Sequence, residues 1–323
     1  MKNKFSRRSF ILKSALASVG TTMALNGFAK ITDFPKYALP DIGIAAGKIS
    51  IFSKNLQWIA DYKNMAEVAT SMGFDGIDLT VRPGGHVLPE NVIIDLPNAV
   101  QAIRNEGLEV YMITTAIDNA DHPETENILK TAQSLGIKKY RTGWLNYDKK
   151  LGIEQNLGEF KDQLTKLANL NEKYNIQGNY QNHSGLNLGG SIWDLWLVLK
   201  DINPRWLACQ YDIRHATLEA ANSWPLGLEL LKNNIGSLDI KDFQWSKKVD
   251  KWEVENVALG QGMVDFPKYF QMLKAYQINA PFSIHYEYPL GGAENGMKQI
   301  AIPAKDVISA MKKDLETLKT WLI

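Results

Sequence analysis

Short apolar segments alternate along most of the chain with longer segments whose apolar residues recur every three or four positions. The first pattern predicts buried β-strands and the second predicts amphipathic helices. Eight strands are predicted, at Ile49–Phe52, Gly76–Val81, Glu109–Thr115, Lys139–Thr142, Gln177–Asn182, Ala208–Asp212, Ile235–Ile240 and Phe282–Tyr286. Helices are predicted at Leu56–Met72, Glu124–Leu135, Leu157–Tyr174, Phe266–Tyr276 and, closing the chain, Ala304–Leu322.

Strict alternation of strand and helix predicts a parallel sheet. Eight such units favour a single-domain α/β fold, the (β/α)8 TIM barrel, over a doubly wound sheet, which usually has fewer strands. No Gly-x-Gly-x-x-Gly motif follows the first strand, so no nucleotide cofactor is expected. The longest irregular segment, residues 243–264, is predicted to be a functional loop such as a lid. Trp193 and Trp196 fall in a helical pattern with leucines and are predicted to lie in the core.

The first 29 residues are typical of an export signal peptide. They have a basic start with no acidic residue, then a weakly apolar stretch of small residues that ends in Gly27-Phe28-Ala29. The segment Ser6–Lys13 resembles the twin-arginine signal, so an exported, periplasmic protein cleaved near Ala29 is expected. Residues 30–44 would then be a leader segment and residues 45–323 the barrel domain, with no stable membrane span after cleavage.

Charge and cysteine content narrow the possible partners. Removal of residues 1–29 takes away five basic residues, which leaves 31 Lys and Arg against 35 Asp and Glu, a net charge of −4. No basic stripe remains for a phosphate backbone, so a nucleic acid partner is not expected. Cys209 is the single cysteine and can form no internal disulfide. Stability must therefore come from one large apolar core.

Polar residues follow the predicted strands at the edge where ligands bind in parallel α/β proteins. The segment Tyr211–Ala216, reading YDIRHA, places Asp212 at the end of the sixth strand and His215 three residues later. The structural alternative is that Asp212 caps the next helix and His215 binds backbone. All histidines fall at or just beyond predicted strands, namely His86, His122, His183, His215 and His285.

Residues two apart on a strand share a face, so such pairs could point together into the mouth of a barrel. Three pairs are placed in this way: Gln181 with His183, Asp239 with Lys241, and His285 with Glu287. Converging carboxylate, amide and imidazole groups could hold a divalent metal such as Mg, Mn, Co or Zn.

Five segments then occur in a fixed order: Asn182–Gly185 (NHSG), Tyr211–Ala216 (YDIRHA), Asp239–Phe243 (DIKDF), Leu259–Gly262 (LGQG) and Phe282–Glu287 (FSIHYE). They resemble successive landmarks of the xylose-isomerase-like TIM barrels, the sugar phosphate isomerase/epimerase group. The resemblance spans roughly residues 45–320. It implies a barrel that acts on a small-molecule carbohydrate, without identifying the sugar.

The resemblance also implies a metal site. Members of the family typically hold one divalent metal through Glu, Asp, His and Glu on strands five to eight, and the two Glu form the acid/base pair. In this chain Asp212 matches the strand-six ligand, and His215 matches a substrate-contacting histidine. The other positions depart from the pattern, and the resulting set would be Gln181, Asp212, Asp239 and His285, with Glu287 two residues further on. The alternative is a metal-free site in which Asp239 and Lys241 form an ion pair.

Gln181 in place of a Glu bears on mechanism. An amide can ligate a cation but cannot take a proton from carbon, so proton exchange between two carboxylates is not expected. Proton abstraction next to a carbonyl needs a base and a cation or donor that stabilises the enediolate oxygen. The catalytic candidates are His183, His215, Lys241 and Glu287, while His285 is a further candidate base and Arg214 or a metal a further candidate electrophile.

Aromatic and basic residues beyond the strands are candidates for sugar recognition, with loop packing as the alternative. They are Arg82, His86, Trp144, Arg214 and Trp245. The leading functional hypothesis is an isomerase- or epimerase-like enzyme that moves a proton next to the carbonyl of a sugar or keto-sugar. The alternatives are a lyase or hydratase that acts on a 3-keto-glycoside by elimination, and a sugar-binding barrel without activity.

Overall fold

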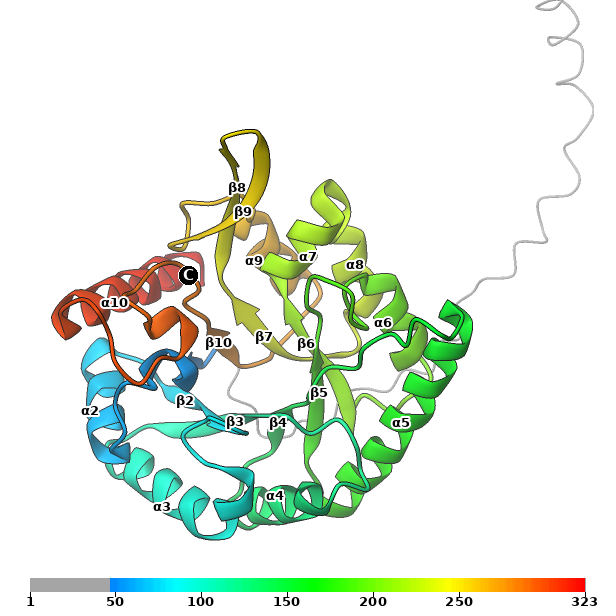
Figure 1. Ribbon diagram of the computed structural model, residues 1–323, viewed down its shortest axis with the longest axis horizontal. Helices are drawn as coiled ribbons and strands as arrows, with labels where there is room; N and C mark the ends of the chain where they lie inside the picture. Colours follow the sequence, from blue (N-terminus) through cyan, green and yellow to red (C-terminus); the bar gives the residue numbers. More distant parts are fainter. Residues whose placement is uncertain (1–46, 323) are drawn as a thin grey trace, which may run out of the picture. The chain divides into compact units, whose positions relative to one another are not determined.

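The computed structural model describes residues 47–322, so the predicted signal peptide and leader segment lie outside the described residues. Eight parallel strands close into a barrel in the order β1, β10, β7, β6, β5, β4, β3, β2 (Figure 1). The strands are β1 (Ile49–Phe52), β2 (Gly76–Val81), β3 (Glu109–Thr115), β4 (Lys139–Arg141), β5 (Gln177–Gln181), β6 (Leu207–Asp212), β7 (Ile235–Ile240) and β10 (Phe282–Ile284). The TIM barrel prediction is confirmed, and the predicted strands differ from the observed ones by at most two residues at an end.

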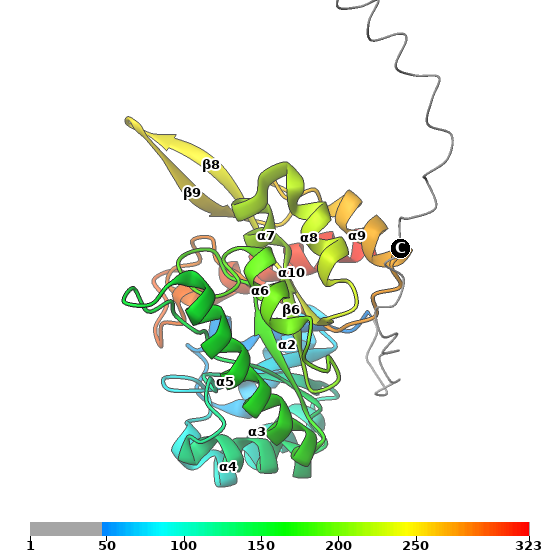
Figure 2. The same ribbon diagram turned by 90° about the vertical axis from the view of Figure 1, so that its right-hand side faces the viewer.

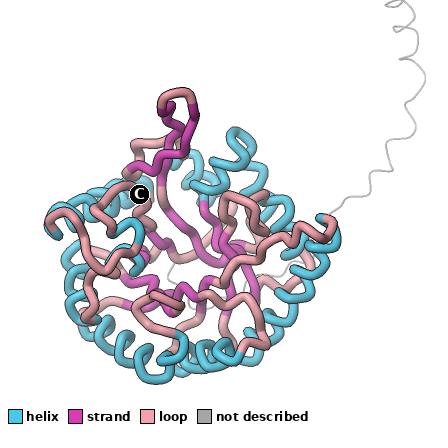
Figure 3. Tube along the Cα trace, in the orientation of Figure 1, coloured by secondary structure: helices cyan, strands magenta, loops and turns pink. Residues whose placement is uncertain are grey.

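Helices surround the barrel because each strand is followed by an amphipathic segment whose apolar face packs on the sheet (Figure 3). They are α2 (Tyr62–Met72), α3 (Val92–Asn105), α4 (Pro123–Ser134), α5 (Ile153–Tyr174), α6 (Ile192–Leu199), α7 (Ile213–Ala220), α8 (Trp224–Leu231), α9 (Phe266–Ala275) and α10 (Ala304–Trp321). Among residues 47–322, no helix has both the length and the apolar content needed to cross a bilayer.

Two helix predictions need correction. The helix predicted from Leu56 begins only at Tyr62, because Asp61 accepts a hydrogen bond from the backbone N of Asn64 (2.8 Å) and so caps α2. Trp193 is not in the core. It is 55% exposed, since the buried face of α6 is formed by Ile192, Leu195, Val198 and Leu199, whereas Trp196 is half-buried against the core.

The segment at residues 243–264, predicted to be irregular, is largely a β-hairpin, so the prediction of irregular structure is wrong, while its role as a lid stays a prediction. Strands β8 (Asp242–Lys248) and β9 (Lys251–Val257) pair in antiparallel fashion and project from the barrel (Figure 2). Asp242 anchors the hairpin by accepting backbone N–H bonds from Gly260 (3.0 Å) and Gly262 (2.9 Å). A Cβ atom at Gly262 would lie 2.3 Å from Asp242 Oδ1, so the LGQG segment is explained by this close approach.

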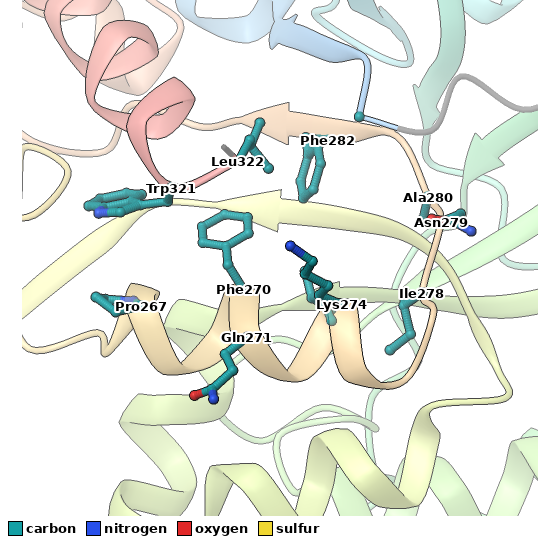
Figure 4. A pocket seen from close by; sticks show the side chains of 12 residues that line it. Pro267, Phe270, Gln271, Lys274, Ile278, Asn279, Ala280, Phe282, Trp321 and Leu322 are labelled. Carbon is teal, nitrogen blue, oxygen red and sulfur yellow. The ribbon is translucent and has the colours of Figure 1, made fainter.

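A cavity of about 470 Å³ lies between α9, the start of β10 and the end of α10 (Figure 4). Its walls include Phe270, Lys274, Phe282 and Trp321. Because Phe282 is the first residue of β10, this cavity is at the amino ends of the strands, away from the edge where the polar residues converge. Of the described residues that line it, none carries a carboxylate or an imidazole side chain.

Candidate active site

Strands β5, β6, β7 and β10 bring polar side chains together at their carboxyl ends. Gln181 ends β5, Asp212 ends β6, Asp239 lies in β7 beside Asp212, and Lys241 and His285 follow β7 and β10 directly. All five side chains are buried. The sequence prediction that these residues share one edge of the barrel agrees with this geometry.

Asp212 is the centre of the cluster. Its Oδ1 accepts a hydrogen bond from the backbone N of His215 (3.1 Å), so it caps α7 as the structural interpretation expected. Its Oδ2 accepts from Gln181 Nε2 (2.9 Å) and pairs with Lys241 Nζ (3.0 Å). The carboxylate therefore caps α7 through one oxygen and faces the polar cluster through the other.

The ion pair between Asp239 and Lys241 that the metal-free alternative expected is not formed, because their charged atoms are not within 4.0 Å. Side chains at i and i+2 of a strand stand about 6.6 Å apart on one face, so the Lys241 ammonium lies further towards the barrel mouth than Asp239. It reaches Asp212 on the neighbouring strand instead.

Asp239 is a buried carboxyl group held by amides. Gln181 Nε2 donates to its Oδ2 and Gln210 Nε2 donates to its Oδ1, both at 2.6 Å. His285 Nε2 lies 3.3 Å from Asp239 Oδ1. Burial, followed by the charge of Asp212, raises the pKa of Asp239 well above its usual range. The site therefore contains one carboxyl group whose charged form is disfavoured.

Arg141 sets the orientation of the Gln181 amide. Its Nη1 donates to Gln181 Oε1 (3.0 Å), and a guanidinium has no acceptor, so the oxygen of the amide must face Arg141. The amide nitrogen then faces the two carboxylates of Asp212 and Asp239.

These contacts do not fit a resident divalent metal. A metal would need lone pairs from Gln181, Asp212, Asp239 and His285, but Gln181 presents an N–H group to both carboxylates and the Lys241 ammonium adjoins Asp212 Oδ2. A divalent ion beside that ammonium would be repelled. Within residues 47–322, no three His, Cys, Asp or Glu side chains are arranged to hold a metal.

His183 presents a free imidazole nitrogen to the site. Its Nδ1 lies 2.8 Å from the carbonyl oxygen of Ser184, which can only accept, so Nδ1 carries the proton and Nε2 has the lone pair. The ring packs against Trp144, with centroids 4.8 Å apart. Burial and the positive charge of Lys241 lower the pKa of His183, so the imidazole is neutral near pH 7.

His215 has the opposite tautomer. Arg214 Nη1 lies 3.0 Å from its Nδ1 and can only donate, so Nδ1 accepts and Nε2 carries the proton. This Nε2 is buried without a hydrogen-bond partner among the described residues, 3.6 Å from Asp212 Oδ2. Burial and the charge of Lys241 hold the pKa of His215 well below its usual range. Its N–H group is thus available to a bound ligand.

The base of the hairpin forms part of the wall of the site. Asn256 on β9 accepts a hydrogen bond from Arg214 Nη2 (2.7 Å) and donates to the carbonyl oxygen of Glu287 (3.3 Å). The ring of Phe243 lies 5.2 Å from Arg214 Cζ. Arg214 is therefore fixed from both sides, which in turn fixes the tautomer of His215.

Glu287 is held as a carboxylate. Its Oε1 lies 3.2 Å from Lys54 Nζ and 3.8 Å from Lys241 Nζ. Burial alone would raise the pKa of Glu287, but Lys241 and Lys54 outweigh it and lower the pKa. Glu287 is therefore suited to accept a proton or a hydrogen bond rather than to act as an acid near pH 7.

The candidate recognition residues divide into two groups. Trp144 contacts His183 and lies 4.7 Å from Arg141 Cζ, and Arg82 and Arg214 also lie at the site. His86 lies apart, with Nδ1 3.2 Å from Thr80 Oγ1, and burial lowers its pKa to about 4. Trp245 is on the hairpin and 43% exposed, outside the cluster.

Sequence reasoning missed Lys54 and Arg141. Both occupy the same kind of position as the predicted residues, since Lys54 follows β1 and Arg141 ends β4. Their place at or just beyond a strand end is the same signal that identified Arg82 and Lys241, so position alone would have identified them. By contrast, His122 is an exposed cap at the start of α4 and takes no part in the site.

A family model described as Xylose isomerase-like TIM barrel matches residues 66–308. No curated protein matches the chain.

Several solved structures share the fold. The chain is 16% identical to 3-keto-D-glucoside 4-epimerase from E. coli in its apo form, with 84% of this chain and 99% of that chain covered and a TM-score of 0.61. It is 16% identical to the probable 3-DHS dehydratase involved in petrobactin synthesis from Bacillus anthracis (83% and 98% covered, TM-score 0.64). It is 17% identical to the IolI protein with a bound zinc atom (85% and 99% covered, TM-score 0.66). At such low identity these likenesses show the fold alone.

Proposed function

Because this chain belongs to the xylose isomerase-like TIM barrel family, we propose that it is an enzyme that moves a proton at a carbon next to the carbonyl of a sugar or keto-sugar. One observation carries the proposal: the rings of His183 and His215, packed at an angle of 42° with centroids 3.9 Å apart, have opposite tautomers beside the Lys241 ammonium. A base, a hydrogen-bond donor and a cation are thus grouped at one place.

In the proposed reaction, His183 Nε2 takes the proton from the carbon. The electron pair of that C–H bond forms the enediolate, and the negative charge gathers on the former carbonyl oxygen. Lys241 stabilises this oxygen, as a fixed cation does in a water-poor site. Delivery of the proton to the former carbonyl carbon, while the hydroxyl proton of the first carbon passes to the enediolate oxygen, gives isomerisation. Protonation of the first carbon on its opposite face by a second donor, with His183 keeping the proton it took, gives epimerisation.

The second candidate function is elimination from a 3-keto-glycoside, which the position of His215 favours. Its Nε2–H group has no partner among the described residues and adjoins the base, so it can donate a hydrogen bond to an oxygen that leaves from the carbon beside the enediolate, while His183 passes to that oxygen the proton it took from the carbon. The solved structures that share the fold include both an epimerase and a probable dehydratase, which is consistent with either outcome.

The test uses methyl 3-keto-α-D-glucopyranoside in deuterated water, followed by NMR. Deuterium at a carbon next to the carbonyl supports proton transfer, and release of methanol identifies elimination. If the sugar stabilises the protein against heat but neither exchanges nor is cleaved, the chain is a sugar-binding barrel and the proposal is wrong. His183→Gln serves as the matched inactive variant.

We also propose that the protein is exported to the periplasm through the twin-arginine signal. Fractionation of cells that express the full chain should find the processed protein in the periplasm, whereas a chain with Arg7→Lys and Arg8→Lys should stay unprocessed. Processing of both chains alike would contradict the twin-arginine route.

A further inference from the structure

Three guanidinium groups lie at the site without a carboxylate partner. Among the residues that the structure describes, no nitrogen of Arg82, Arg141 or Arg214 lies within 4.0 Å of an Asp or Glu oxygen. Arg214 instead contacts His215 and Asn256, and Arg141 donates to Gln181. Removing an ion from water costs several kcal/mol unless an opposite charge compensates it. The missing counter-charge therefore calls for an explanation.

Two of these groups converge around one buried side chain. The Cζ atoms of Arg82 and Arg141 lie 5.5 Å and 5.8 Å from the centre of the Phe52 ring, and Lys54 Nζ lies 5.8 Å from it. His285 stacks on the same ring with centroids 4.3 Å apart. The three cations are thus neighbours at the end of β1, next to the polar cluster.

The aromatic ring does not supply the missing charge. A cation–π contact contributes about 0.5–2 kcal/mol, which is less than the cost of burying an unpaired guanidinium. Arg82 and Arg141 also repel each other, since burial and then the charge of Arg82 lower the pKa of Arg141 to about 10. Moreover, Nε of Arg141 is buried without a hydrogen-bond partner among residues 47–322.

The nearby carboxyl groups are already engaged. Asp78 accepts hydrogen bonds from Thr114 Oγ1 and Ser283 Oγ, both at 2.8 Å, and burial raises its pKa. Glu287 is paired with Lys54. The charges of Asp78 and Glu287 act on Arg82 and Arg141 only from beyond 4.0 Å and offset their burial in part, so an anion from outside the chain would complete the compensation.

We propose that Arg82 and Arg141 form a subsite for an anionic group of the substrate, a carboxylate or a phosphate, and that the substrate is an acidic sugar. The guanidinium fork matches both oxyanions with two parallel hydrogen bonds. The statement about the substrate rests on the proposed function, whereas the anion subsite stands on the geometry alone. A neutral sugar would leave the two charges only partly compensated.

Binding of three pyranoses that differ only at C6 tests the subsite. D-glucuronate carries a carboxylate there, D-glucose 6-phosphate a phosphate and D-glucose a hydroxyl group. Isothermal titration calorimetry should find one of the two acids bound on the order of ten- to a hundredfold more tightly than glucose. Whichever acid binds better identifies the anionic group. Equal binding of all three, or binding of none, would overturn the proposal.

Arg82→Gln is the informative variant, because the Arg82 side chain donates no hydrogen bond to another residue within 47–322. It should abolish the preference for the acid, and Arg82→Lys should keep part of it. Arg104→Gln, which removes a pair with Glu109 on the exposed surface, is the matched control and should keep the full preference. If Arg82→Gln still binds the acid more tightly than glucose, the proposal is contradicted.

Thermal unfolding separates this role from a structural one. Without ligand, Arg82→Gln should melt close to the wild-type temperature, since the lost attraction to Asp78 and Glu287 is offset by relief of burial of the charge and of the repulsion with Arg141. A clear drop would assign Arg82 a structural role and count against the subsite.

The two proposals fail in different ways. Calorimetry with these three sugars requires no turnover, so an absence of deuterium exchange rejects the proton-transfer function while the preference for an acid stays intact. Conversely, exchange on a neutral keto-sugar with no preference for an acid rejects the subsite alone.

Discussion

The imidazole rings of His183 and His215 pack at an angle of 42° with centroids 3.9 Å apart, yet their hydrogen bonds require opposite tautomers. A backbone carbonyl of Ser184 takes the Nδ1 proton of His183, and Arg214 forces Nδ1 of His215 to accept. As a result, Nε2 of His183 offers a lone pair, whereas Nε2 of His215 offers an N–H group. Two identical side chains thereby become a base and a donor.

The exchange of His183 for Gln removes the base and retains a polar side chain. The rate of deuterium exchange into the keto-sugar should fall by about 10²- to 10⁴-fold, the usual contribution of a general base. His122→Gln is the control, because that histidine is exposed at the start of α4. Equal rates in wild type and His183→Gln would mean that another group is the base.

The pH profile of kcat/KM should report His183. The base is active when neutral, and burial with the nearby Lys241 lowers its pKa below 6.5. Activity should therefore be flat around pH 7 and be lost as the pH falls through a value below 6.5. A loss of kcat/KM at low pH whose midpoint lies above pH 7 would contradict the assignment of His183 as the base.

His86 should make stability depend on pH. Its pKa is 6.5 in the unfolded chain and about 4 in the folded one, so the unfolded state binds more protons between these values. The unfolding free energy should fall by about 3 kcal/mol as the pH drops from 6.5 to 4, and little further from this group below that. When the unfolding free energy is measured by urea unfolding at several pH values, its dependence on pH between 4 and 6.5 should be weaker in His86→Gln than in the wild type.

Asp212 and Lys241 should be coupled in stability. Asp212→Asn or Lys241→Met each leaves a buried partner without its counter-charge, which costs about 3–5 kcal/mol. The double variant should cost clearly less than the two single ones together, as measured by urea unfolding. Additive costs would mean that the 3.0 Å ion pair contributes nothing. All three variants should lose turnover.

Removal of metal should have no effect. Since the amide nitrogen of Gln181 and the Lys241 ammonium face the carboxylates, dialysis against a chelator should change neither turnover nor melting temperature. Elemental analysis of the purified protein provides the counterpart. One divalent ion per chain, with activity lost on its removal and regained on its return, would contradict the conclusion that these side chains do not hold a metal.

Local sequence patterns were sufficient for the barrel. The alternation of apolar runs and amphipathic segments is a property of neighbouring residues, and it determined all eight barrel strands within two residues. The same patterns placed Asp212 at the end of β6 and Lys241 just beyond β7. They failed for the hairpin at Asp242–Val257, whose strands pair with each other outside the barrel and lack a repeating helix between them.

The chemistry of the site was decided by the tertiary structure. Which carboxylate Lys241 meets, which way the Gln181 amide points and which nitrogen of His215 carries the proton all depend on atoms from other strands and from the hairpin. The sequence alone determined that polar residues gather at one edge of a barrel. Only the closed barrel decided their partners, because it brings within hydrogen-bond distance residues that are far apart along the chain.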